Sequence, residues 1–286
     1  MAKVADFRAA RPTWCPGCGD FGVLNALTRA VTDLGLEPED VVVVSGIGCS
    51  GKISQYFGGY GFHGIHGRSL PIAQGVKLAN RDLTVIAAGG DGDGYGIGLS
   101  HVIHAIRRNV DLTYIVMDNH IYGLTTGQLA PTSDKGMKTK TSPYGSVEEP
   151  VRPLELALAQ GCGFVAQAFS GEINHMAEVF KKAIQHKGFS LVNVFSPCVT
   201  FNKLNTYDYF KARLINLDED PDYDRHDRAA AMRKVMETGG MVIGVVYETD
   251  KPTYEEQLPG FPEEGLAHQP LALDPAELEA LEAQFA

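Results

Sequence analysis

The amino-acid sequence predicts an α/β fold: a doubly wound, mostly parallel sheet with a C-terminal extension. Up to about residue 198, short apolar runs of strand length alternate with amphipathic helical segments along the 286-residue chain. Val41–Val44 is an unbroken β-branched run, which is typical of a strand buried on both faces of a parallel sheet. Glycines gather in residues 46–98, which indicates backbone packed closely around a ligand.

The elements before residue 198 follow from hydrophobic spacing and from glycines that end helices. Residues 20–35 carry leucine and valine on one helical face and end at Gly35. The same spacing predicts a helix that begins near Ile173 and stops before Gly188. Further helices are predicted at residues 69–80, 96–108 and 153–160, and further strands at residues 83–88, 112–117, 164–169 and 190–195.

A change in composition after Cys198 divides the chain. Residues 1–198 are predicted to form a cofactor-binding domain, and residues 199–286 an extension that packs on it or on a partner subunit. Within the extension, a helix near residues 225–238 and a strand at Met241–Tyr247 are expected to return to the main body. Residues 248–273 carry four prolines and many carboxylates, so they are predicted to form an extended arm before a short helix that begins at Asp274-Pro275.

Charge and hydropathy exclude two kinds of partner. The formal net charge of −10 argues against nucleic acid, because binding to phosphates needs a basic surface. The chain has no apolar run long enough to span a bilayer and no segment of signal-peptide type at its start, so a cytoplasmic protein without membrane contact is expected. In that compartment cysteines more often bind metals or carry redox chemistry than form disulfides.

Four of the five cysteines have the setting of metal ligands. Cys15 and Cys18 form a C-P-G-C pair, and Cys49 and Cys198 lie farther along the chain beside glycine or proline. One short-spaced pair with two distant cysteines is a common way to hold an iron–sulfur cluster. A structural zinc site and buried, inert thiols are the alternatives that the cysteines alone leave open. Cys162 has no such partner and is predicted to be a small buried hydrophobic residue.

The glycine-rich segment Gly46–Gly51 formally matches the dinucleotide fingerprint G-x-G-x-x-G. That fingerprint also needs an acidic residue about 20 positions later to hold a ribose. Between Asp40 and Asp82 the chain has no Asp or Glu, which argues against a dinucleotide site. Instead this stretch holds cations and histidines, so it suits phosphates and substrate carboxylates.

Two other predicted strand ends carry oxygen ligands. Asp91 lies in G-G-D-G-D-G after one strand, and Asn119 follows the next strand in D-N-H-I-Y-G, 28 residues later. Because the carboxyl ends of parallel strands meet at one edge of a sheet, these two side chains and a loop carbonyl can hold Mg²⁺ against a diphosphate. This spacing predicts thiamine diphosphate as the cofactor.

The ordered motifs resemble the thiamine-binding beta subunit of 2-oxoacid:ferredoxin oxidoreductases, and most of all the 2-oxoglutarate branch. The resemblance covers roughly residues 12–215. It is carried by W-C-P-G-C-G, G-I-G-C-S-G-K, H-G-R-S-L-P-I-A-Q-G-V-K-L-A-N, G-G-D-G-D, D-N-H-I-Y-G-L-T-T-G-Q and S-P-C-V-T.

The resemblance implies a role for each motif residue. It makes Lys52 and His66 catalytic, with Lys52 facing the substrate carboxylate. It implies that one [4Fe–4S] cluster is held by Cys15, Cys18, Cys49 and Cys198, and that Mg²⁺ is held by Asp91, Asn119 and the backbone carbonyl of Ile121. It implies that the thiamine cofactor is bound by Ile47, Gly48, Cys49, Ser50, His66, Gly92, Asp93, Gly123 and Leu124.

The implied reaction is oxidative decarboxylation of 2-oxoglutarate to succinyl-CoA and CO2, or its reverse, with coenzyme A as co-substrate and ferredoxin as electron partner. An alpha subunit is expected to supply the carboxylate beside the aminopyrimidine, because the chain is too short for a second domain of similar size. Pyruvate or a broad range of 2-oxoacids is an alternative substrate. The alternative functions are a non-oxidative thiamine-dependent decarboxylase with a structural metal and a non-catalytic scaffold.

Overall fold

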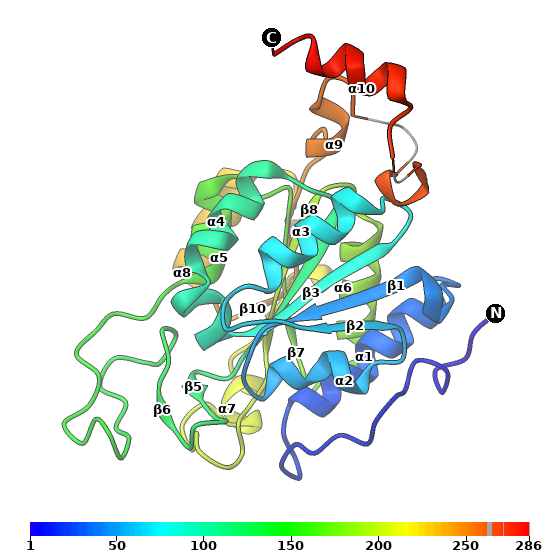
Figure 1. Ribbon diagram of the computed structural model, residues 1–286. Coiled ribbons are helices and arrows are strands. Elements are labelled where there is room, and N and C mark those ends of the chain that lie inside the picture. Colours follow the sequence, from blue (N-terminus) through cyan, green and yellow to red (C-terminus); the bar gives the residue numbers. More distant parts are fainter. Residues whose placement is uncertain (262–264, 271, 286) are drawn as a thin grey trace.

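The computed structural model describes residues 1–286 except residues 262–264, 271 and 286. Its centre is an eight-stranded sheet in the order β2-β1-β3-β4-β8-β7-β10-β9, in which β7 and β10 are antiparallel and all other neighbours are parallel (Figure 1). The predicted fold class is therefore confirmed. The strands of this sheet are β1 (Val41–Ser45), β2 (Tyr60–His63), β3 (Thr84–Gly90), β4 (Leu112–Asp118), β7 (Phe164–Phe169), β8 (Phe189–Phe195), β9 (Ile215–Asn216) and β10 (Val242–Glu248), and a separate hairpin pairs β5 (Ile121–Tyr122) with β6 (Gln128–Leu129).

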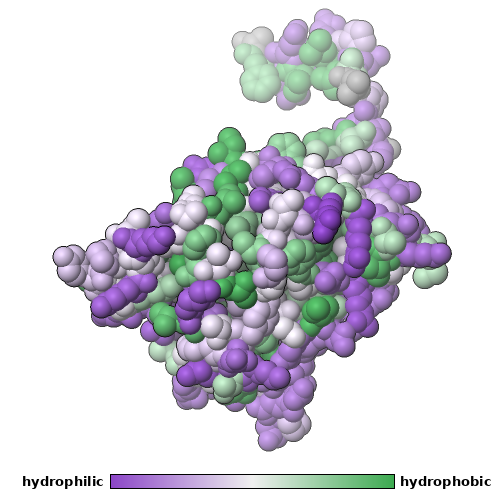
Figure 2. Space-filling model, turned by 90° about the horizontal axis from the view of Figure 1, so that it is seen from below, coloured by the Kyte–Doolittle hydropathy of each residue, from purple (hydrophilic) through white to green (hydrophobic). Residues whose placement is uncertain are grey.

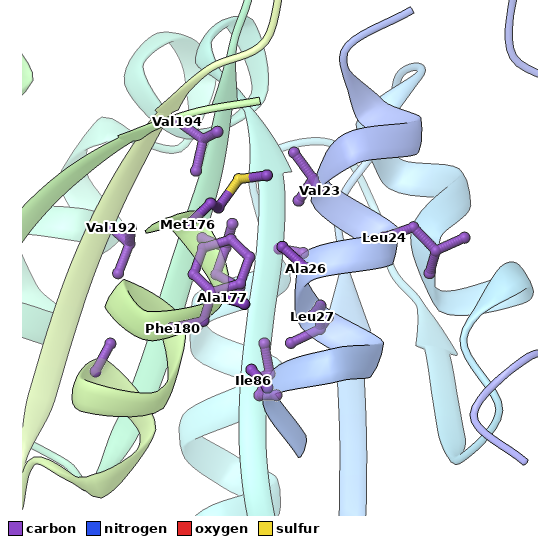
Figure 3. Packing of buried hydrophobic residues seen from close by; sticks show 14 of the residues in the cluster. Val23, Leu24, Ala26, Leu27, Ile86, Met176, Ala177, Phe180, Val192 and Val194 are labelled. Atoms are coloured by element: carbon purple, nitrogen blue, oxygen red, sulfur yellow. The ribbon is translucent and has the colours of Figure 1, made fainter. Parts of the chain in front are cut away.

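Helices cover both faces of the sheet, which explains the continuous apolar runs of the central strands. Every residue of β1, β4, β7 and β8 is buried. Figure 3 shows Val23 and Leu27 of one helix facing Met176 and Phe180 of another above the sheet. One face is covered by α1 (Asp20–Asp33) and α6 (Ile173–Gln185), and the other by α3 (Ser69–Ala79), α4 (Leu99–Arg108), α5 (Pro153–Gln160) and α8 (Arg228–Glu237).

The predicted helix at residues 96–108 differs from the structure at its start. A π-helical turn, η3 (Gly92–Ile97), precedes α4, and Gly96 has non-helical backbone angles between them. Such turns recur at functional sites. The sequence also did not predict β2, because this edge strand is exposed along its whole length and lacks a buried face.

The C-terminal extension joins the main sheet. β10 pairs with β7, and the short strand β9 pairs with β10, so the predicted strand at Met241–Tyr247 is confirmed with a shift of one residue. The division at residue 198 stays a prediction. Beyond β10 the chain forms α9 (Tyr254–Gln257), which lies against the body beside Asp111, and then an arm that projects from the body and carries α10 (Pro275–Glu282), with the predicted capping box at Asp274 (Figure 1). Within the described residues, none of the helices combines the length and apolarity that a membrane crossing needs.

Candidate active site

The loops at the carboxyl ends of β1, β3 and β4 enclose one cavity, which we call the cofactor cavity. Every residue that the sequence assigned to thiamine or Mg²⁺ binding lines it, together with three further residues, Gly90, Tyr122 and Thr125. The predicted residues in the cavity are Ile47, Gly48, Cys49, Ser50, His66, Asp91, Gly92, Asp93, Asn119, Ile121, Gly123 and Leu124. The structure therefore brings these residues together, while their roles stay predictions.

Asp93 connects two of the loops that form this cavity. Its buried carboxylate accepts hydrogen bonds from the backbone N–H groups of Ile47, at 2.9 Å, and Gly67, at 2.8 Å. Gly46 must lack a side chain, because a Cβ there would lie 2.0 Å from the Asp93 carboxylate. The Nδ1 atom of His66 lies 3.5 Å from the same carboxylate, so Asp93 orients this ring as well.

A pair of buried carboxylates lies at the predicted magnesium site. The Thr132 hydroxyl lies 2.6 Å from Asp91 Oδ2 and 2.9 Å from Asp118 Oδ1. Burial, and then the charge of Asp118, raise the pKa of Asp91 above its usual range. A divalent cation would compensate this buried negative charge. The donor set of Asp91, Asn119 and the Ile121 carbonyl therefore fits Mg²⁺, which prefers oxygen ligands.

The sequence did not identify three residues of this site. The Thr132 hydroxyl lies between the carboxylates of Asp91 and Asp118, and Tyr122 donates its hydroxyl hydrogen to the Gly92 carbonyl at 3.0 Å. The Tyr122 ring packs against Gly92 so closely that a Cβ there would lie 2.2 Å from it. Tyr122 and Asp118 stand in the D-N-H-I-Y-G motif and could have been read from it, whereas no local signal marks Thr132.

Four thiols surround a second cavity, the cysteine cavity, which adjoins the first. It is lined by Trp14, Cys15, Cys18, Cys49, Asn119, Gly123, Cys198, Val199, Thr200 and Phe201. Cys49, Asn119 and Gly123 therefore line both cavities. In the described part of the chain, no three His, Cys, Asp or Glu side chains converge closely enough to hold a single metal ion. As predicted, Cys162 is buried elsewhere, in the core on the opposite face of the sheet, where its thiol donates to the Phe164 carbonyl at 3.2 Å.

The surroundings of two of these thiols, Cys18 and Cys49, disfavour the free anionic form. Burial, and then the nearby carboxylate of Asp20, raise the pKa of Cys49 to about 11, and the same two causes raise that of Cys18 further. Iron ions displace thiol protons on binding and would supply the positive charge that this cavity lacks. Trp14 supports the cavity wall by donating its Nε1–H to the Cys49 carbonyl at 2.7 Å. Four cysteines around one cavity, all free of disulfides, fit an iron–sulfur cluster.

Lys52 lies beside the two cavities rather than in their walls, and its role toward a substrate stays a prediction. It is not among the residues that line either cavity, and its Nζ atom lies 3.4 Å from the Thr13 hydroxyl. It ends the short 3-10 helix η2 (Ser50–Lys52), directly after the loop that forms the cofactor cavity. Its positive charge nevertheless lowers the pKa of Cys49, against the larger effect of burial, so it lies near the cavity.

The fold and the cofactor cavity together define a thiamine diphosphate-binding domain of the type found in thiamine enzymes. The family described as "Thiamine pyrophosphate enzyme, C-terminal TPP binding domain" matches residues 46–194. The family of the C-terminal part of the pyruvate ferredoxin oxidoreductase beta subunit matches residues 198–263. The first match covers the three loops of the cofactor cavity, and the second begins at the fourth cysteine of the cysteine cavity.

Similarity to known proteins identifies the group of thiamine enzymes that the chain resembles. The chain is 45% identical over 258 residues to the 2-oxoacid:ferredoxin oxidoreductase subunit beta of Saccharolobus solfataricus, which covers 86% of this chain and 85% of that protein. It is 46% identical over 213 residues to the 2-oxoglutarate synthase subunit KorB of Archaeoglobus fulgidus, which covers 73% of this chain and 79% of that one. The solved 2-oxoglutarate:ferredoxin oxidoreductase of Magnetococcus marinus, with 2-oxoglutarate, coenzyme A and succinyl-CoA bound, matches with a TM-score of 0.90 and 41% identity over 98% of this chain and 96% of that one.

The chain belongs to the family of 2-oxoacid:ferredoxin oxidoreductase beta subunits. The relatives named for 2-oxoglutarate support the 2-oxoglutarate branch that the motifs indicated.

Proposed function

We propose that this protein catalyses the oxidative decarboxylation of 2-oxoglutarate to succinyl-CoA and CO2 and passes the electrons through a [4Fe–4S] cluster to ferredoxin. The wall shared by the two cavities carries the proposal, because Cys49 and Gly123 line both. A non-oxidative decarboxylase needs no redox centre beside its cofactor, whereas an oxidative enzyme needs one close by. The names of the relatives support 2-oxoglutarate and ferredoxin as the reaction partners.

In the cofactor cavity, Asp91, Asn119 and the Ile121 carbonyl would hold Mg²⁺ and, through it, the diphosphate. Bound thiamine diphosphate supplies carbanion chemistry at the 2-oxo carbon. The protein contributes position: Asp93 fixes the Ile47 loop and orients His66 at the cavity wall. The Nδ1 atom of His66 is buried and makes no hydrogen bond among the described residues, and the Asp93 carboxylate 3.5 Å away keeps the ring at the cavity wall.

In the cysteine cavity, Cys15, Cys18, Cys49 and Cys198 would hold the cluster. Ligation by four cysteines favours a low reduction potential, which an acceptor of electrons from a 2-oxoacid and a donor to ferredoxin both require. Cys15 is exposed, whereas Cys49 faces the cofactor cavity. This arrangement places an inner thiol toward the site of chemistry and an outer thiol toward solvent.

An alpha subunit would close the cofactor cavity. Exposed apolar side chains lie on the edge strand β2 and at the cavity: Tyr60 and Phe62 on β2, Ile65 beside His66, and Leu124 in the cavity wall, each between 46% and 73% exposed. Figure 2 views the molecule from the side of the strand carboxyl ends and shows apolar patches between hydrophilic residues. Apolar groups that rim a cofactor cavity are typical of a surface covered by another chain.

Activity of the assembled enzyme tests this function. We expect anaerobically purified protein with its alpha subunit to show the visible absorbance of an iron–sulfur cluster and to reduce ferredoxin only when 2-oxoglutarate and coenzyme A are both present. The chain without its alpha subunit should lack this activity. Release of CO2 without reduction of ferredoxin would instead identify a non-oxidative decarboxylase, and faster turnover of pyruvate would change the substrate.

Lys52 is expected to attract the substrate carboxylate. Replacing it by alanine should raise the KM for 2-oxoglutarate by about tenfold, which corresponds to the loss of one charge-assisted hydrogen bond. The content of iron and thiamine should stay normal. Steady-state kinetics measure this effect. Lys187, an exposed lysine that lies 3.9 Å from Asp111, provides the control, and its alanine variant should behave as wild type. Unchanged kinetics in the Lys52 variant would remove the substrate role and leave the cofactor site as proposed.

A further inference from the structure

A third cavity, which we call the arginine groove, lies on the other side of Trp14 from the cysteine cavity. It is formed by the N-terminal segment together with α1 and the short helix α2 (Ile53–Tyr56). The Trp14 side chain lines both this groove and the cysteine cavity. The residues that line the groove are Arg8, Ala9, Ala10, Arg11, Pro12, Trp14, Pro16, Phe21, Leu24, Asn25 and Tyr56.

The charge of this groove is opposite to that of the whole chain. The net charge of the protein is −10, yet residues 1–18 carry three cations and a single carboxylate, that of Asp6. Arg8 donates to the Asn25 side chain at 3.1 Å, and no carboxylate of the described residues forms an ion pair with Arg8 or Arg11. Their charges are therefore available to a partner.

One further cation lies near the thiols. Lys203 is exposed and its amine donates to the carbonyl of Val199, a residue in the wall of the cysteine cavity. Val199 lies beside Gly17, the residue that precedes Cys18 in the C-P-G-C pair, since a Cβ at Gly17 would be 3.7 Å from the Val199 side chain. Positive charge thus stands near the exposed Cys15 loop both in the arginine groove and beside Val199.

We propose that the arginine groove is the docking surface for the acidic face of the electron-carrier protein that accepts electrons from the cluster. The inference rests on the proposed function, since it requires a cluster in the cysteine cavity. Complementary charge speeds the encounter of redox partners and sets their orientation, while prolines and aromatic rings supply a small apolar contact. Each encounter moves one electron from the cluster, which is oxidised, to the carrier, which is reduced, so two encounters follow the oxidation of one 2-oxoacid.

The test compares two electron acceptors on the complete enzyme with its alpha subunit. Arg11 has no hydrogen-bond partner in the described structure, so Arg11→Glu changes charge with little effect on folding. In Arg11→Glu and in the double variant with Arg8→Glu, we expect the KM for ferredoxin to rise at least about fivefold and to depend less on ionic strength. Reduction of methyl viologen, a small acceptor that needs no docking surface, should stay at the wild-type rate.

Two matched variants complete the design. Arg107 lies exposed on α4, which covers the opposite face of the sheet, and Arg107→Glu should leave the KM for ferredoxin unchanged. Arg11→Lys keeps the charge and should retain most of the affinity.

An unchanged KM for ferredoxin in the double variant would overturn the proposal. A changed KM for coenzyme A would show a phosphate site instead, and equal loss of both acceptor activities would show a surface for the alpha subunit. Absence of ferredoxin reduction by the wild-type enzyme would be a failure of the proposed function itself.

Discussion

Replacing Cys198 by serine is expected to remove the iron–sulfur cluster and to abolish ferredoxin reduction. Cys198, the last residue of the predicted domain in the sequence, lines the cysteine cavity. Both its sulfur and that of Cys49 lie within 4 Å of the position that a Cβ at Gly123 would take. A serine hydroxyl is a poor ligand for iron, so bound iron should fall to less than about a tenth of the wild-type content. Iron analysis and the visible spectrum of anaerobically purified protein measure the loss.

Cys162→Ser is the control for this experiment. Its thiol lies within hydrogen-bond distance of the carbonyls of Phe164 and Phe189, and a hydroxyl can donate its hydrogen to either of them, so the buried site should tolerate the change. Iron content and ferredoxin reduction should stay normal. If Cys162 were as critical as the other thiols and Cys198 dispensable, the assignment of the ligands would be wrong.

Replacing Asp91 by asparagine should weaken the binding of Mg²⁺ and thiamine diphosphate at least about 100-fold, because the change removes a charged metal ligand. The same change should not lower the unfolding temperature of the cofactor-free protein. Burial and the neighbouring charge of Asp118 raise the pKa of Asp91, so its ionised form destabilises the fold at neutral pH, and a neutral amide relieves this cost.

Thermal unfolding with and without cofactor separates the two effects. Mg²⁺ with thiamine diphosphate should raise the unfolding temperature of the wild type and leave that of Asp91→Asn nearly unchanged. Asp222→Asn, at an exposed carboxylate of the extension, should respond like the wild type. Equal cofactor affinity in Asp91→Asn and the wild type would mean that another residue holds the metal. Iron content should be normal in all three proteins.

The buried part of the fold could be predicted because its strands are apolar without interruption. β1, β4, β7 and β8 are covered by helices on both faces, so their sequences carry the signal directly. β2 gave no such signal, since it is an exposed edge strand. Its pairing with β1 depends on backbone hydrogen bonds that any sequence can make.

Some residues of the candidate site could likewise be predicted from the sequence, and others could not. Motif residues such as Asp91 and Asn119 could be placed together because neighbouring parallel strands end at one edge. The contact of Thr132 with Asp91 could not be predicted, because the two residues are 41 positions apart in the sequence and no local motif marks Thr132. The role of Lys52 stays a prediction, since a flexible side chain at the end of a short helix can point to either side of it.

The spread along the chain of the four cysteines that we propose as cluster ligands has a consequence for biosynthesis. Three of them lie in the first 49 residues, whereas Cys198 follows β8, a strand that pairs between β4 and β7 in the middle of the sheet. A ribosome therefore releases three thiols long before the polypeptide that completes their cavity has been made. Iron delivered to the nascent chain would meet an incomplete and open ligand set. Insertion of the proposed cluster would accordingly follow assembly of the central sheet, and a loaded cluster would then mark a finished fold.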